Sequence, residues 1–336
     1  MENKNKNSIS ELRQDLVTGG WVVIAIGRAQ RPEQFAEFKR EKIEEDRNKL
    51  CFFCHPEETG QEKDVLIYKK DNGDWSLRVF PNKYPAFKRG GKMKHHEEGP
   101  YFKMDGVGYH EVIVTRDHNR QIAQLETLEV AEIVDAYQER YIDLMNKKDV
   151  NYIEIFCNHG KEVGASIVHP HSQLAAIPVI SPYIQAELDG AESYYRTNRH
   201  CVYCTIAEWE SEHKKRIVFE NDSFVAFCPF SSRAAFEVWV MPKKHKPYFE
   251  RISDEEKVAF AEALQTSISK IYKALGDPPY NFYLHTSPCD GKDYPHFHWH
   301  LEILPHTAIW AGFELSTGIE VSTIEPEAAA EYLRKQ

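Results

Sequence analysis

The stretch VHPHSQL places two histidines and a glutamine at alternate positions, His169, His171 and Gln173. Alternate residues of a strand project from the same face, so two imidazoles and a carboxamide would lie together. An imidazole can bind a metal or act as a nucleophile near neutral pH. The spacing therefore indicates metal binding, group transfer, or both.

Two pairs of cysteines share the spacing C-x-x-C: Cys51 with Cys54, and Cys201 with Cys204. In a reducing cytoplasm such pairs are metal ligands or redox dithiols rather than structural bridges. Each pair is followed by a histidine and then, at an equal interval, by a strand that contains further histidines. This recurrence indicates an internal repeat and favours metal binding.

The repeat predicts two Cys₂His₂ sets, each suited to tetrahedral zinc. The predicted ligands are Cys51, Cys54, His118 and His169 in the first set, and Cys201, Cys204, His245 and His296 in the second. Both sites would be closed and hence structural. The alternative is buried cysteines and hydrogen-bonded core histidines. If His169 binds zinc, His171 and Gln173 remain free for chemistry.

Matching secondary-structure patterns surround these residues in both halves of the chain. The paired segments are strands at 111–118 and 237–245, helices at 128–145 and 254–275, and strands at 151–158 and 280–286. Each half closes on its histidine strand. We therefore expect an α+β fold of two tandem modules, each an antiparallel sheet packed with helices. The predicted N-terminal module is 1–180 and the C-terminal module is 181–336.

Composition narrows the class of protein. The 336 residues are 42% hydrophobic and 28% charged, which suits two domains with their own cores. A formal charge of −10 opposes binding to duplex nucleic acid, which needs a basic surface. No apolar run reaches the length of about 18 residues that spans a membrane. The start, MENKNKNSIS, lacks the apolar core of a signal peptide. We expect a cytoplasmic protein.

The motif HPHSQ resembles the active-site motif of the galactose-1-phosphate uridylyltransferase family, within the histidine-triad superfamily. The resemblance extends over GGWVVIAIGRAQRP, CFFC, RVFPNKYPA, FCNHGKEVGASIVHPHSQ and AGFELSTG. It implies nucleotidyl transfer with His171 as covalent nucleophile, Gln173 bonding the phosphoryl oxygens and Ser166 contacting a phosphate. Pro170 fixes φ and offers only a carbonyl, which we expect to hold the His171 ring.

The resemblance also implies nucleotide and sugar contacts. The matching residues are Arg28 and Arg31 for the diphosphate, Phe53 and Phe80 for the base, Asn82 and Asn158 for ribose and phosphate, and Phe313 and Glu314 for the hexose. Ordinary core packing is the alternative for the two phenylalanines. Lys83 stands where the best-known uridylyltransferases carry an aspartate, so we expect a relaxed or shifted base preference.

A third metal, iron or zinc, is implied near the second histidine strand, HFHWHLEIL. The matching residues are Glu187, His285, His298 and His300, and a hydrogen-bonded histidine cluster is the alternative. The equal interval makes His298 the counterpart of His171. Because this strand lacks the proline and the glutamine of the first, we expect a catalytically retired second module.

Three functions are compatible with these features. The first is transfer of a nucleoside monophosphate between a nucleoside-diphosphate hexose and a hexose 1-phosphate, as in a uridylyltransferase, by a homodimer that binds only small molecules. The second is an ADP-sugar phosphorylase or adenylyltransferase, because FPNKYPA and AGFELSTG are similar to that branch of the family. The third, a zinc-stapled nucleic-acid-binding module, is opposed by the acidic charge.

Overall fold

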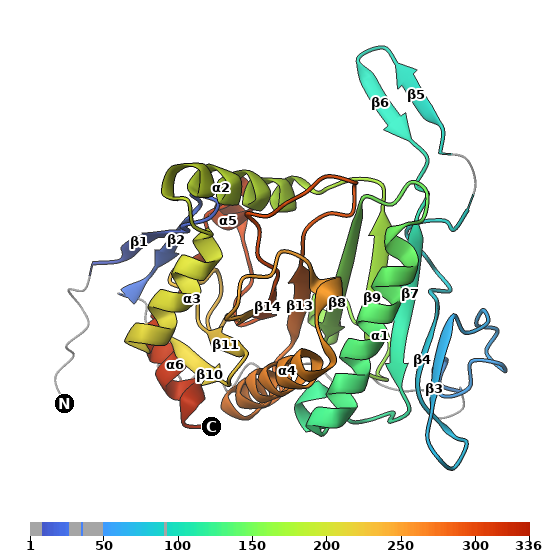
Figure 1. The fold of residues 1–336 in the computed structure, drawn as a ribbon. Helices are drawn as coiled ribbons and strands as arrows, with labels where there is room; N and C mark the ends of the chain where they lie inside the picture. Colours follow the sequence, from blue (N-terminus) through green and yellow to red (C-terminus); the bar gives the residue numbers. More distant parts are fainter. Residues whose placement is uncertain (1–8, 27–34, 36–49, 91–92) are drawn as a thin grey trace.

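A computed structural model describes residues 9–26, 35, 50–90 and 93–336. At its centre lies one antiparallel sheet of ten strands that runs through both halves of the chain (Figure 1). From edge to edge its strands are β10 (Ile217–Glu220), β11 (Phe224–Phe227), β12 (Val238–Pro242), β14 (His300–Pro305), β13 (Tyr280–His285), β8 (Tyr152–His159), β9 (His171–Ile177), β7 (Tyr109–Thr115), β4 (Trp75–Pro81) and β3 (Leu66–Lys69).

The sheet confirms the predicted α+β fold and the duplication. Each half contributes five strands in the same spatial order, so that β8 of the first half and β13 of the second meet at the centre. These two strands pair antiparallel, with Phe282 opposite Cys157. The two predicted sheets are therefore joined edge to edge into one.

Two long helices cover one face of the sheet, α1 (Thr127–Met145) and α4 (Asp254–Leu275) (Figure 1). Both match predicted helices. In α4, Ser253 and Glu256 form a capping box, and Gly276 ends the helix at a φ of 72°, which glycine adopts without strain. The apolar stripes of both helices pack on the sheet in one continuous core, which fixes the strands that carry the histidines.

The other face of the C-terminal half is also covered. The covering elements are α2 (Pro182–Asn198), α3 (Val202–His213) and a small sheet of β1 (Glu11–Gln14), β2 (Trp21–Ile24) and β15 (Val321–Ser322). Because β2 pairs with β15, the first described residues pack on the C-terminal half, across the predicted module boundary. Every residue of β14 is buried, whereas in β9 buried residues alternate with half-buried ones.

The remaining elements are short. They are α5 (Gly312–Thr317), α6 (Pro326–Arg334), the 3₁₀ turns Ile122–Gln124, Lys161–Val163 and Phe249–Arg251, and the hairpin β5 (His95–Glu98) and β6 (Tyr101–Met104). The hairpin projects away from the body (Figure 1). No helix among the described residues is long and apolar enough to cross a bilayer.

Candidate active site and metal centres

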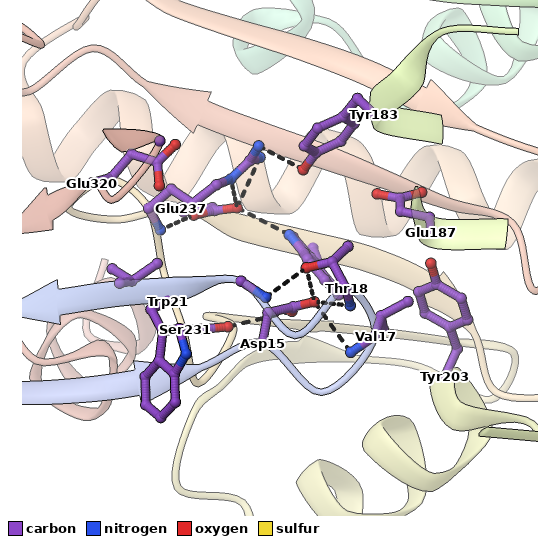
Figure 2. A pocket seen from close by; sticks show the side chains of 15 residues that line it. Asp15, Val17, Thr18, Trp21, Tyr183, Glu187, Tyr203, Ser231, Glu237 and Glu320 are labelled. Atoms are coloured by element: carbon purple, nitrogen blue, oxygen red, sulfur yellow. Dashed lines mark hydrogen bonds and ion pairs between the residues drawn. The ribbon is translucent and has the colours of Figure 1, made fainter. Parts of the chain in front are cut away.

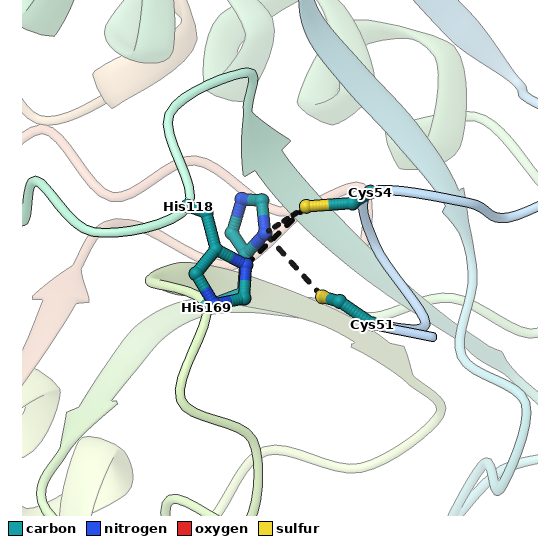
Figure 3. Close-up of side chains that lie close together, drawn as sticks. All are labelled: Cys51, Cys54, His118 and His169. Atoms are coloured by element: carbon teal, nitrogen blue, oxygen red, sulfur yellow. Dashed lines mark hydrogen bonds between the residues drawn. The ribbon is translucent and has the colours of Figure 1, made fainter. Parts of the chain in front are cut away.

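The first predicted Cys₂His₂ set comes together in space (Figure 3). Cys54 Sγ lies 3.3 Å from His118 Nδ1 and 3.4 Å from His169 Nδ1, and Cys51 Sγ lies 3.6 Å from His169 Nδ1. With metal distances of about 2.3 Å to sulfur and 2.0 Å to nitrogen, the S···N edge of a tetrahedral zinc site is about 3.5 Å. The four donor atoms are therefore spaced for one zinc ion.

The tautomer of His169 also suits a metal ligand. Its Nε2 donates to the Thr115 carbonyl at 2.8 Å, so that Nδ1 keeps its lone pair directed at the cysteines. Burial lowers the pKa of His169 to about 4, which keeps the ring neutral. Zinc binds the neutral imidazole.

The second Cys₂His₂ set differs from the prediction by one ligand. Cys201, Cys204 and His245 are joined by His298, not by His296. His298 is buried, and its Nδ1 lies 3.5 Å from Cys204 Sγ. His296 is half-buried, with its ring against Tyr294. The prediction was wrong because it assumed a uniform interval between the halves, whereas the second histidine strand is offset by two residues.

The same offset changes the third group. Glu187, His285 and His300 are joined by Glu302 in place of the predicted His298. Glu187 Oε2, His300 Nε2 and Glu302 Oε1 are buried without a hydrogen-bond partner among the described residues, and the closest approach of His300 Nε2 and Glu302 Oε1 to each other is 3.5 Å. A buried polar atom left unpaired costs about 1–3 kcal/mol, and two carboxylates with two imidazoles suit iron or zinc. The residues present therefore fit a metal better than a self-satisfied hydrogen-bonded cluster.

The structural counterpart of His171 is thus His300, not His298. His171 Nδ1 lies 3.0 Å from the carbonyl oxygen of His169, and His300 Nδ1 lies 3.1 Å from that of His298. The two rings are held in the same way in the two modules. We predicted that the Pro170 carbonyl holds the His171 ring. The carbonyl that holds it belongs to His169 instead.

The hydrogen bond of His171 defines its chemistry. A carbonyl oxygen only accepts, so Nδ1 carries the proton and Nε2 carries the lone pair. Burial lowers the pKa of His171, which keeps the ring neutral near pH 7. The edge of Phe53 packs on the ring, with centroids 5.0 Å apart, and limits its rotation. His171 is a fixed, neutral imidazole with one basic nitrogen.

Polar residues predicted to act with His171 surround it to different degrees. Gln173 lies on the same face of β9, and its side-chain oxygen is 3.4 Å from Asn82 Nδ2. Asn158 lies near the end of β8, beside this face, and its Oδ1 accepts from Asn281 at 2.8 Å. Ser166 is exposed in the loop before His169. One contact was missed: His110 Nε2 lies 2.8 Å from Gln173 Oε1.

The residues predicted to contact the base differ in how they are placed. Phe80 is fully buried and Phe53 is 3% exposed, in a cluster with Val112 and Val114. Phe80 offers a base no surface, so core packing describes it. Lys83 Nζ donates to the Thr59 carbonyl at 2.8 Å. Arg28 and Arg31 lie outside the described residues.

A groove of about 490 Å³ lies at the junction of the two modules, beside the strands that carry the predicted site. Phe156, which pairs opposite Gln173, lines the groove together with Asn158, Tyr283 and Trp310. Its volume is in the range of small-molecule sites. The predicted hexose contacts, Phe313 and Glu314, do not line this groove. Glu314 instead caps α5 by accepting from the Ala311 backbone N–H.

A second, smaller cavity lies within the C-terminal half (Figure 2). A cavity of only about 120 Å³ remains between α2, the β1–β2 turn and β12. Arg233 lies there and donates to Tyr183 and Glu237. Gly190 of α2 has no room for a Cβ, which would come within 1.9 Å of the Val17 carbonyl oxygen. A nucleotide needs a larger site than this cavity.

The duplicated sheet, with one open histidine face beside a Cys₂His₂ cluster, defines a histidine-triad-like nucleotidyltransferase. The family model for the N-terminal domain of galactose-1-phosphate uridyl transferase matches residues 1–180, and a domain of unknown function, DUF4921, matches residues 91–336. The chain belongs to the galactose-1-phosphate uridylyltransferase family. It is therefore an enzyme rather than a nucleic-acid-binding module.

Relatives from two branches cover nearly the whole chain. ADP-glucose phosphorylase of Arabidopsis thaliana is 32% identical, over 98% of this chain and 94% of the relative. Galactose-1-phosphate uridylyltransferase of Thermotoga maritima is 31% identical, over 97% and 98%. The crystal structure of the Arabidopsis phosphorylase with bound ADP-glucose superposes with a TM-score of 0.80 at 30% identity, over 98% of this chain and 99% of that one. A uridylyltransferase structure gives 0.75 at 26%, over 97% and 98%.

Proposed function

We propose that the protein transfers a nucleoside monophosphate from a nucleoside-diphosphate hexose to a phosphate-bearing acceptor through a covalent nucleotidyl-His171. The observation that carries this proposal is the state of His171. Its Nδ1 proton is held by the His169 carbonyl at 3.0 Å, so the basic Nε2 can attack without a separate base.

In the first half-reaction, the Nε2 lone pair attacks the α-phosphorus. The P–N bond forms while the bond from phosphorus to the bridging oxygen breaks, and hexose 1-phosphate leaves with that electron pair. The imidazole then carries a positive charge, which the His169 carbonyl stabilises through Nδ1–H. In the second half-reaction, a phosphate oxygen of the acceptor attacks phosphorus, the P–N bond breaks, and Nε2 recovers its lone pair. Ping-pong kinetics follow.

Gln173 is assigned to the phosphoryl oxygens, since a neutral amide donor stabilises charge at phosphorus without competing for the proton. Asn82, Asn158 and Ser166 are assigned to the ribose and phosphates around it. Arg28 and Arg31 are assigned to the diphosphate, because a guanidinium forms paired bonds with phosphate oxygens.

Metals have a supporting role in this proposal. The two Cys₂His₂ clusters would hold structural zinc, because four protein ligands leave no open position. The group of Glu187, His285, His300 and Glu302 would hold iron or a further zinc. All three lie outside the transfer steps and would stabilise the fold around the reactive strand.

The first candidate for the full reaction is a UDP-hexose and hexose 1-phosphate uridylyltransferase, in line with the family. A second candidate, an ADP-sugar phosphorylase with inorganic phosphate as acceptor, is favoured by the 32% identity to ADP-glucose phosphorylase. Lys83 also supports a shifted base preference, because it supplies no carboxylate for the ribose hydroxyls.

The acceptor separates these candidates. Protein preloaded with UDP-glucose or ADP-glucose, and freed of small molecules, is mixed with galactose 1-phosphate or with inorganic phosphate. A uridylyltransferase discharges the uridylyl group to galactose 1-phosphate, whereas a phosphorylase discharges the adenylyl group to phosphate and releases ADP. If both adducts stay on the protein in the presence of both acceptors, both candidates are contradicted.

We also propose a cytoplasmic homodimer. Ile309, Phe313 and Leu315 are exposed apolar side chains near one another in the sequence, from 52% to 86% exposed, and such a concentration favours a protein contact. Light scattering coupled to size exclusion tests this assembly, and a monomer at micromolar concentration would contradict it.

A further inference from the structure

His110 lies beside the reactive strand. It belongs to β7, whose residue Val112 pairs opposite Gln173, and it lies two positions from Val112, on the same face. Its Nε2 is 2.8 Å from Gln173 Oε1. This contact is shorter than the one from Asn82 to the same oxygen, at 3.4 Å. His110 is therefore the main protein partner of Gln173 among the described residues.

A backbone group fixes the tautomer of His110. The Ala86 N–H donates to His110 Nδ1 at 3.3 Å, and because a backbone amide only donates, Nδ1 must accept. Burial lowers the pKa of His110, although the bond to Gln173 opposes that shift, so the ring stays neutral near pH 7. The single proton of the ring is then on Nε2, which donates to Gln173.

Asn82 is oriented in a similar way. The Tyr84 N–H donates to Asn82 Oδ1 at 2.9 Å, so the Asn82 amide nitrogen is the group turned toward Gln173. The same nitrogen lies 3.4 Å from His110 Nε2. Because Nε2 carries the proton of the ring, it cannot accept from Asn82, and Gln173 is the acceptor that both donors share. Two donors thus converge on one atom of the Gln173 carboxamide. That atom must be the oxygen, since the flipped amide would place its own hydrogens against both donors.

Because its oxygen accepts from His110 and Asn82, Gln173 presents its NH₂ group on the side away from these two residues. No described residue accepts from this group. Flipped, the same side chain would present its oxygen to the negatively charged phosphoryl oxygens and repel them. The rotamer of the carboxamide therefore decides whether Gln173 stabilises or destabilises charge at phosphorus.

We propose that His110 is a positioning residue that fixes the Gln173 carboxamide with its NH₂ group toward the phosphoryl oxygens at His171. This inference rests on the proposed function. His110 itself acts through Gln173, anchored by the Ala86 backbone N–H.

Two substitutions separate orientation from ring packing. His110→Phe keeps the ring and loses the donor, whereas His110→Gln loses the ring and keeps an amide nitrogen near the position of Nε2. Losing a donor to developing charge outright costs about 100- to 1000-fold in rate, and because Asn82 still holds the amide, we expect about 10- to 100-fold for His110→Phe. His110→Gln should recover most of the rate, with KM for the nucleotide sugar little changed in both variants. His96→Leu, on the exposed β5 strand, is the matched control.

The readout is the rate at which His171 gains a nucleotide in one turnover, measured by quenched-flow mass spectrometry. In a Gln173→Ala background, His110→Phe should have no further effect, because there is no amide left to orient. The inference would be overturned if His110→Phe formed the adduct faster than His110→Gln. It would also be overturned if His110→Phe lowered the rate in the Gln173→Ala background by as much as it does in wild type. His110→Leu replaces His110→Phe if the latter fails to fold.

Failure of the proposed function gives a different result. A wild-type protein with no adduct on His171 refutes the covalent mechanism, and this inference with it. A wild type that forms the adduct at the same rate as folded His110→Phe refutes the role of His110 alone.

Discussion

Replacement of His298 or of His296 by alanine distinguishes the ligand that the structure places in the second Cys₂His₂ cluster from the one that equal spacing predicts. His298 Nδ1 lies 3.5 Å from Cys204 Sγ, whereas His296 lies outside the cluster. We expect His298→Ala to contain one zinc fewer per chain than wild type, and His296→Ala to contain the full number.

The magnitude follows from the loss of the ion. Structural zinc contributes an apparent free energy of about 10–16 kcal/mol, and His298→Ala loses this contribution together with the zinc. Unfolding entropy of about 2.1 cal/mol/K per residue over 336 residues gives about 0.7 kcal/mol/K. For cooperative unfolding, His298→Ala should therefore lower Tm by roughly 14–23 °C, plus a smaller loss from packing. His296→Ala should change Tm by less than about 1 °C, as is usual away from buried features.

The assay is metal analysis of gently purified protein together with thermal unfolding, with and without a chelator. Chelation should lower Tm less in His298→Ala than in wild type, because one site is already impaired. A zinc lost from His296→Ala but not from His298→Ala would refute the assignment. Full zinc content in both variants would refute the second cluster as a zinc site.

Three further outcomes are expected. Wild-type kcat/KM values for UDP-glucose and ADP-glucose should differ by less than about a thousandfold, and Lys83→Asp should shift the ratio toward uridine; an unchanged ratio would place base selection elsewhere. Gly190→Ala should destabilise the protein by about 1–3 kcal/mol in urea unfolding, because its Cβ meets the Val17 carbonyl, whereas a gain, as for an open helix position, would contradict that contact. Arg140→Met should cost about 1–3 kcal/mol, because the buried Glu111 carboxylate loses the bonds from Arg140 at 2.7 and 2.9 Å and keeps the one from Arg89 at 3.2 Å; wild-type stability would show that the bonds from Arg140 contribute nothing.

Sequence reasoning located the elements because periodicity depends on local residues. The predicted helix at 254–275 coincides with α4, and the one at 128–145 differs from α1 by one residue at its start. The first Cys₂His₂ set was also recovered, because a C-x-x-C pair followed by two distant histidines is typical of tetrahedral zinc sites.

The second histidine strand shows where such reasoning stops. In HFHWH, His296, His298 and His300 alternate equally well, so the pattern cannot choose among them. Only the strand register, which pairs His300 with His285, places His298 in the Cys₂His₂ cluster and makes His300 the counterpart of His171.

Two other features depend on pairing between strands that are distant in the sequence, so local patterns could not predict them. The contact of His110 with Gln173 depends on the register between β7 and β9, which no local signal in GYHEVIVT reveals. The pairing of β2 with β15 joins segments nearly the full length of the chain apart.

The covalent nucleotide on His171 is the centre of the proposed mechanism, and peptide mapping of the loaded enzyme tests it most directly. Wild-type protein and His171→Asn are incubated with UDP-glucose and with ADP-glucose, and the adducts are located by mass spectrometry at neutral pH. We expect one nucleotidyl group on His171, stoichiometric release of glucose 1-phosphate, and neither event in folded His171→Asn. An adduct on another residue, or turnover by folded His171→Asn, would contradict the mechanism.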